Sequence, residues 1–197
     1  MSDFLTLAAQ KREATGKGVA RRLRASGQVP AVFYNTKGDS TPIQVSEREL
    51  LKVYGQVKRT CVFNIDIAGA GTFPALIWDV DYYPAKNKIQ HVDVFGVDLN
   101  KEIKIRVPLQ YVGTAKGTKV GGKLEVYREV ITLVGKPLAL PQHVDVQVSE
   151  LEINGIIRVE DLKLPEGVRA DYDNNFAIVA VTLGRGATEG QGEEGAE

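Results

Sequence analysis

A histidine and an aspartate, His91 and Asp93, stand two residues apart in a segment where apolar and polar residues alternate. Side chains of a β-strand point alternately to opposite faces, so Val92 and Val94 are predicted to enter the core. His91 and Asp93 would then lie side by side on the outer face, together with Ile89. Such a pair could act as a catalytic dyad, form half of a metal site, or contact bases and 2′-hydroxyls of RNA. An inert, exposed strand face is the remaining alternative.

The enzymatic and metal interpretations lack the further residues that they need. A histidine base requires a nucleophile beside it, but the single cysteine, Cys61, falls on the predicted core face of a strand, and the chain has no Gly-x-Ser-x-Gly motif. Zinc requires more ligands than one cysteine and two histidines, His91 and His143, without ligand spacing. The sequence therefore predicts no catalytic residue, no metal and no cofactor. A hydrolase or transferase that uses His91 and Asp93 is kept as the weaker alternative.

A glycine-rich segment at residues 117–123 resembles a phosphate-binding loop as far as its lysine, Lys123. The next residue is Leu124, where a serine or threonine should hold magnesium. The residues after it alternate like a strand, whereas a phosphate-binding loop opens a helix. We interpret the segment as a loop between strands.

A second candidate for binding chemistry is a run of basic residues near the N-terminus, opposed only by Glu13. Lysines and arginines neutralise phosphates, and Gly16 and Gly18 let the backbone approach a nucleic-acid strand closely. The alternative is a solvated helix face, because residues 19–25 are predicted to form a short helix. The basic residues of this run are Lys11, Arg12, Lys17, Arg21, Arg22 and Arg24.

The charge of the chain is zero as a whole but is unevenly distributed. Residues 1–93 contain 13 Lys and Arg against 9 Asp and Glu, and residues 94–197 contain 12 against 16. A positive first half and a negative second half suggest that only the first half faces a polyanion. We find no apolar run typical of a signal peptide or a membrane helix, and a single cysteine fits a reducing compartment, so we expect a cytoplasmic protein without membrane contact.

Periodicity predicts a mainly β chain with two β-rich domains. Residues 1–97 form the first, with one further helix that begins at a capping box, Ser46 to Glu49, and is closed by Gly55. Residues 98–184 form the second. Residues 185–197 hold only small and polar residues and are expected to be a disordered acidic tail.

Both halves of the chain resemble the bacterial large-subunit ribosomal protein family twenty-five, in its two-domain form, which is also called the general stress protein CTC. The first half carries the resemblance in Arg12, Gly16-Lys17-Gly18, Arg21-Arg22-Leu23-Arg24, Gly27, Pro30-Ala31-Val32, Tyr34, Pro84 and His91-Val92-Asp93. The second half carries it in Val107-Pro108-Leu109, Val112-Gly113-Thr114, Gly117, Gly121-Gly122 and Leu162-Lys163-Leu164-Pro165.

The resemblance implies an N-terminal β-barrel with short helices that binds 5S rRNA at an irregular internal loop with a widened minor groove. Two residues depart from the pattern of many relatives: Asn35 stands where glycine is usual, and Val94 precedes Phe95 where Phe would follow the aspartate directly. Asparagine tolerates a left-handed backbone, so the turn should survive. The residues implied to contact RNA are Arg12, Lys17, Arg21, Arg22, Tyr34, His91 and Asp93.

The function expected from these observations is that of a structural constituent of the large ribosomal subunit that binds 5S rRNA through its first domain. The second domain is then expected to contact neighbouring ribosomal components. A stress-induced interaction module whose second domain binds a protein is the alternative from another class.

Overall fold

A computed structural model describes residues 4–84 and 88–183, so the tail predicted at 185–197 lies outside the described residues. The chain folds as two compact units. Of the described residues, one unit holds 4–84, 88–107, 133–142 and 165–169, and the other holds 108–132, 143–164 and 170–183. Whether a boundary at residue 97 separates two domains that fold independently stays a prediction. Among the described residues, no helix is both long enough and apolar enough to cross a membrane.

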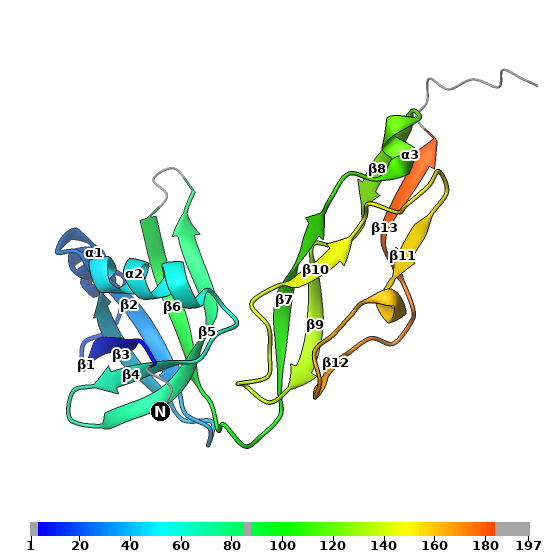
Figure 1. Ribbon diagram of the computed structural model, residues 1–197. Helices are drawn as coiled ribbons and strands as arrows, with labels where there is room; N and C mark the ends of the chain where they lie inside the picture. The colour runs from blue at the N-terminus through cyan, green and yellow to red at the C-terminus, as the bar shows by residue number, and fades with distance from the viewer. Residues whose placement is uncertain (1–3, 85–87, 184–197) are drawn as a thin grey trace, which may run out of the picture. The chain divides into compact units, whose positions relative to one another are not determined.

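The first unit contains a closed six-stranded barrel in the order β1-β3-β2-β6-β5-β4 (Figure 1). Two parallel pairs, β2 with β6 and β1 with β4, join otherwise antiparallel neighbours, and the second pair closes the barrel. The predicted N-terminal barrel is therefore confirmed. The strands are β1 (Thr6–Lys11), β2 (Gln28–Tyr34), β3 (Ser40–Ser46), β4 (Phe63–Ile67), β5 (Gly71–Tyr83) and β6 (Lys88–Gly96).

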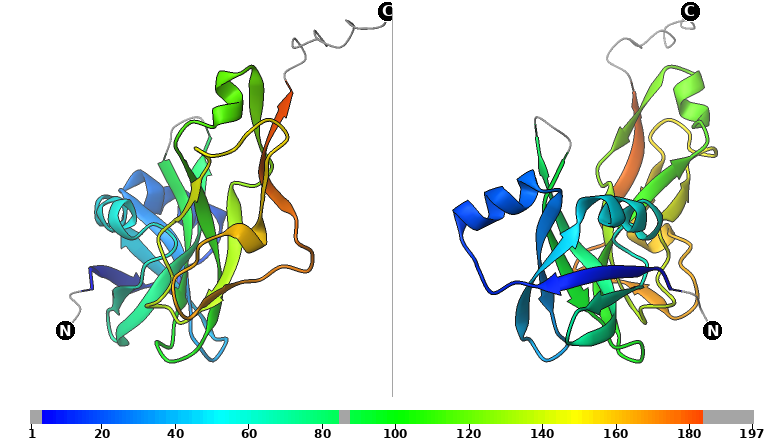
Figure 2. Two further views of the ribbon diagram at one scale, coloured as in Figure 1. Left: turned by 45° about the vertical axis from the view of Figure 1, so that its right-hand side comes forward. Right: turned by 90° about the vertical axis from the view of Figure 1, so that its left-hand side faces the viewer.

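Apolar side chains that alternate along these strands fill the inside of the barrel. Figure 2 shows the ribbon of the barrel from two further sides. Phe63, Ile65 and Ile67 of β4 point inward and are at most 2% exposed, while Asp66 between them is exposed. Closure leaves no free strand edge, so every inward side chain has neighbours on all sides. The side chains that point outward therefore form the outer surface of the barrel, apart from its core.

Two helices accompany the barrel, α1 (Lys17–Ala25) and α2 (Glu47–Val57). Helix α2 places Leu50, Val53 and Val57 in the barrel's core cluster. It starts after Ser46 as predicted, but the side chain of Ser46 makes no capping hydrogen bond. The prediction that Gly55 ends the helix is wrong: Gly55 lies on the exposed side, so the buried face continues by one more turn to Val57.

The strands after the barrel form a four-stranded sheet, β10-β7-β9-β12, and a three-stranded sheet, β11-β13-β8. This confirms a second β-rich region. Its strands are β7 (Ile103–Val112), β8 (Gly122–Val126), β9 (Val130–Gly135), β10 (Val144–Gln147), β11 (Ile156–Arg158), β12 (Val168–Ala170) and β13 (Ala177–Leu183), accompanied by α3 (Lys116–Lys119) and the 3₁₀ helix η1 (Val159–Asp161).

The glycine-rich segment 117–123 has a packing role in this second region. A Cβ atom at Gly117 would lie 2.8 Å from both the backbone nitrogen of Ile153 and a methyl group of Val181. A Cβ atom at Gly122 would lie 2.7 Å from the carbonyl oxygen of Gly117. The interpretation of the whole segment as a loop is wrong: residues 117–119 belong to helix α3, and strand β8 begins within the segment at Gly122. Its glycines serve close backbone approach.

Adjacent leucines of α2 allow a matched test of how the helix supports the barrel. Leu50 is completely buried and Leu51 is 49% exposed. Leu50→Ala should lower the free energy of unfolding by about 2–5 kcal/mol because it leaves a cavity in the core. Leu51→Ala should change it by less than about 0.5 kcal/mol. Urea denaturation of both variants measures the difference, and equal effects would show that α2 does not share the barrel core.

Candidate nucleic-acid interface

Strand β6 places His91 and Asp93 on the outer face of the barrel, as the alternation predicts. Val92 and Val94 are completely buried on its inner face. The Nδ1 atom of His91 lies 3.5 Å from Oδ1 of Asp93, and the two side chains are 28% and 29% exposed. They form a pair that is accessible from solvent yet partly enclosed by neighbouring strands.

The predicted place of Ile89 on this outer face is wrong, because Ile89 is 3% exposed and belongs to the barrel core. The register between β5 and β6 shifts at this point: Asp81 pairs with His91, while the next residue, Tyr82, pairs with Ile89. The irregularity offsets the alternation by one residue. Ile89 therefore turns inward, and the outward residues His91 and Asp93 remain as predicted.

Arg12 and Asp93 lie on one row that crosses the barrel. The backbone N–H of Arg12 donates to the carbonyl of Pro42, Pro42 pairs with Val32, and Val32 pairs with Asp93. Tyr34 follows Val32 by two residues on β2, so it faces outward from the next row. The structure thus gathers Arg12, Tyr34, His91 and Asp93 on one face, from three strand regions distant in sequence.

Two buried side-chain atoms in the described part of the chain have no hydrogen-bond partner: Nε of Arg12 and Oδ1 of Asp93. Folded proteins pair almost all of their buried polar atoms, so such atoms call for an explanation. Both residues belong to the set that the family resemblance implies for RNA contact. One atom is a donor and the other an acceptor, which suits a ligand that presents both kinds of group.

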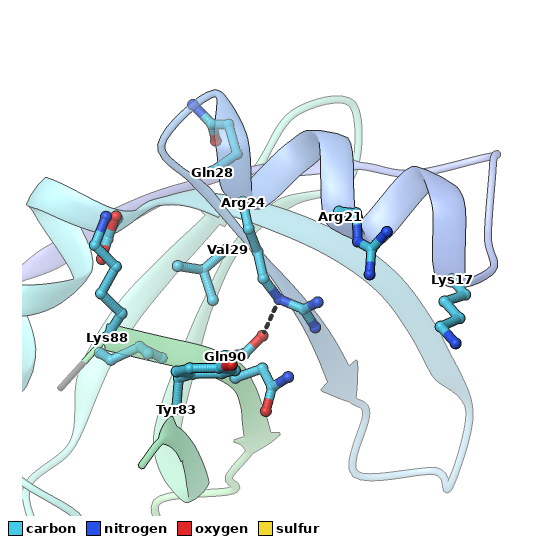
Figure 3. A pocket seen from close by; sticks show the side chains of 10 residues that line it. Lys17, Arg21, Arg24, Gln28, Val29, Tyr83, Lys88 and Gln90 are labelled. Carbon is cyan, nitrogen blue, oxygen red and sulfur yellow. Dashed lines mark hydrogen bonds between the residues drawn. The ribbon is translucent and has the colours of Figure 1, made fainter. Parts of the chain in front are cut away.

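Helix α1 carries the basic residues and is tied to the same face. Nε of Arg24 donates to the backbone carbonyl of Gln90, which is 66 residues away on β6, at 2.9 Å (Figure 3). Lys17, Arg21 and Arg24 line one side of a hollow of about 500 Å³, whose other lining residues include Lys88. Arg22 is exposed but does not line this hollow.

The start of α1 explains why the helix can carry so much positive charge. Gly16 precedes it with a φ of 107°, a conformation that other residues rarely adopt, and its carbonyl accepts the N–H of Ala20. No acidic residue occupies the first turn, while Arg22 and Arg24 lie in the last turn, where cations interact favourably with the helix dipole. The helix is thus stabilised without acidic residues that would offset its charge.

Trp78, which was not among the residues predicted from the sequence, is 54% exposed on β5. Its ring centroid lies 5.6 Å from that of Phe95 on β6. The pairing register shifts between Ile77 and Asp79, so Trp78 is an extra residue in the strand. Alternation alone could not assign its direction, although an isolated tryptophan in a strand near the His91 segment was a usable signal.

Beside Trp78, the turn after α2 contacts β5. Arg59 forms an ion pair with Asp79 at 2.8 Å. Burial is the larger cause and a hydrogen bond with Tyr54 of α2 the smaller cause that together raise the pKa of Tyr82 to about 12. These contacts link α2 and the turn after it to β5, the strand that flanks His91.

A second copy of the five residues Gln90–Val94 occurs at Gln142–Val146, which the sequence analysis did not note. Nε2 of His143 lies 3.4 Å from Oδ1 of Asp145, with side chains 48% and 54% exposed. The copy lies at edge strand β10 of the four-stranded sheet. It provides an internal comparison, because the same residues stand there in more open surroundings.

Comparison with known proteins gives consistent results for both halves. Residues 7–94 match the Ribosomal L25p family, and residues 102–185 match the family described as ribosomal protein TL5, C-terminal domain. A protein of Lawsonia intracellularis is 49% identical over 197 residues, covering 98% of this chain and 100% of the relative. One from Nitratidesulfovibrio vulgaris strain DP4 is 50% identical over 184 residues, with 92% and 97% covered, and one from Syntrophotalea carbinolica is 36% identical, with 94% and 88% covered. All three are named large ribosomal subunit protein bL25.

Two neighbouring arginines test how α1 is attached. Arg24→Ala removes the hydrogen bond to Gln90, and Arg22→Ala removes the same charge from an exposed site. Arg24→Ala should cost about 0.5–1.5 kcal/mol of local stability and speed amide hydrogen exchange across α1. Arg22→Ala should leave the exchange rates nearly unchanged, and similar rates in both variants would contradict the attachment.

Proposed function

Because the chain belongs to the Ribosomal L25p family, we propose that it is a structural component of the large ribosomal subunit and binds 5S rRNA with the outer face of its barrel. The family predicted from the sequence is confirmed for both halves of the chain. Since this is a family of structural ribosomal proteins, the chain is a ribosomal component rather than an enzyme.

The observation that carries the RNA contact is the pair of buried atoms without a hydrogen-bond partner: Nε of Arg12, and Oδ1 of Asp93, which lies 3.5 Å from Nδ1 of His91. A phosphate or a base carbonyl accepts a hydrogen bond from a guanidinium group, and a base amine or a 2′-hydroxyl donates to a carboxylate. RNA presents both kinds of group along one groove. A surface with a donor at one point and an acceptor farther along the same row is complementary to it.

The basic helix supplies the part of the affinity that does not depend on base sequence. Lys17 and Arg21 are exposed at the hollow beside β6, and Arg22 adds charge nearby. Such residues displace the counterions of a phosphate backbone, and this displacement drives much of nucleic-acid binding. The proposed contact set is Arg12, Lys17, Arg21, Arg22, Tyr34, His91 and Asp93.

The proposal assigns the two parts of the chain different tasks. Residues 1–97 act as the RNA-binding domain, and residues 98–184 contact neighbouring ribosomal components. The positive charge of the first 93 residues and the negative charge of the remainder support this division. As a part of the ribosome, the protein would be cytoplasmic.

Replacement of the pair on β6 tests the contact, with the repeated pair as the control. His91→Ala and Asp93→Ala should each weaken 5S rRNA binding by about 1–3 kcal/mol because each removes a polar contact from a desolvated interface. Both side chains lie on the outer face, so the free energy of unfolding should change by less than about 0.5 kcal/mol. His143→Ala and Asp145→Ala remove the same side chains from the same pentapeptide and should leave 5S rRNA binding unchanged.

Affinity and melting temperature are measured together for the four variants. Equal weakening by both pairs would assign the loss to general charge and not to the β6 face. Unfolding of the His91 and Asp93 variants would mean that these side chains support the fold. Unchanged RNA affinity with normal folding would refute their role in binding.

A further inference from the structure

We propose that Trp78 and Phe95 form an aromatic platform on which an unpaired RNA base stacks, next to the His91–Asp93 pair. This inference rests on the proposed function and extends it to two residues outside the contact set. Stacking on aromatic side chains is a common way for proteins to hold an unpaired base, because every base has a flat π face.

The platform begins with an irregularity in the sheet. Along β5, Ile77 pairs with Val94 and Asp79 pairs with Asp93, so Trp78 between them has no partner on β6. An extra residue of this kind bends the strand and redirects its side chain, and such bulges are frequent beside functional sites. Here the irregularity lies directly beside Asp93.

The two rings contact each other and remain open to solvent. Their centroids are 5.6 Å apart with 47° between the ring planes, and Trp78 is 54% exposed. The other ring of the pair, Phe95, is half-buried on the outer face of β6. The ring of Phe95 therefore packs against the ring of Trp78, and the exposed part of Trp78 remains accessible to a ligand.

The surroundings of the platform favour RNA as its occupant. Phe95 follows Asp93 by two residues and pairs across the strands with Tyr34, so the platform is continuous with the face proposed to contact RNA. Asp79, which follows Trp78 on β5, is ion-paired with Arg59, which offsets its repulsion of phosphates. A flat ring beside a hydrogen-bonding pair is suited to a base, whereas a protein partner would require a wider apolar patch.

Trp78 is the only tryptophan of the chain, so its fluorescence reports on this one position. Added to the full-length protein, 5S rRNA should quench the emission and protect Trp78 from acrylamide. A fully paired RNA duplex at the same phosphate concentration should do neither, because it presents no unpaired base. Trp78→Ala should weaken binding to 5S rRNA about 5- to 150-fold, as expected for the loss of one stacked base.

Two further variants separate stacking from a structural effect. Trp78→Phe keeps a smaller ring and should recover most of the lost affinity. Tyr127→Ala removes an aromatic ring that is 47% exposed in the second unit and should have no effect. The melting temperature of each variant should equal that of the unchanged protein, since all three substitutions are at exposed sites.

The outcomes distinguish this inference from the proposed function. If 5S rRNA does not bind the unchanged protein, both are overturned. If His91→Ala weakens binding while Trp78→Ala does not and RNA leaves the emission unchanged, only the platform is overturned. A blue shift of the emission with rising protein concentration, without RNA, would assign the platform to a second copy of the chain and would also overturn it.

Discussion

The parallel pairing of β2 with β6 is the constraint on which the rest of the proposed surface depends. It joins Val32 to Asp93 and Tyr34 to Phe95, residues about sixty positions apart, and fixes which side chains share the outer face. β3, α2, β4 and β5 lie between the two strands along the chain, so their pairing is a long-range contact within the closed barrel. The hydrogen bond from Arg24 to Gln90 adds α1 to the same assembly. The core of alternating apolar residues therefore positions both the polar pair and the basic helix.

Alternation along the sequence predicted the outward direction of His91 and Asp93, and spaced glycines and arginines identified the family. The failures lie where the regular period is interrupted. The register shift near Tyr82 moved Ile89 into the core, and the shift beside Asp79 exposed Trp78. Neither shift can be predicted from the alternation of apolar and polar residues, because it arises from how two strands pair in the barrel. The row from Arg12 to Asp93 could not be predicted from the sequence either, because it forms only when four strands have paired.

The two copies of Gln-His-Val-Asp-Val illustrate why surroundings, and not residue types alone, determine a binding surface. Both copies place histidine and aspartate side by side, at 3.5 Å and 3.4 Å. The copy on β6 is enclosed by strands on both sides, and an oxygen of Asp93 is buried there without a hydrogen-bond partner. The copy at β10 lies at a sheet edge, and about half of each side chain is exposed, so solvent can reach its polar atoms. A ligand that donates a hydrogen bond to the buried oxygen of Asp93 would therefore stabilise the first copy more than the second.

The account's central claim, that the barrel by itself carries the RNA-binding surface, is tested most directly by a fragment of residues 1–97. The fragment contains all six strands of the closed barrel, both of its helices and every residue of the proposed contact set. Its affinity for 5S rRNA is compared with that of the full chain at one fixed salt concentration, after circular dichroism has shown that it is folded. The account predicts nearly equal affinities. A folded fragment that loses more than about 1–2 kcal/mol of binding, the scale of one or two strong contacts, would contradict it.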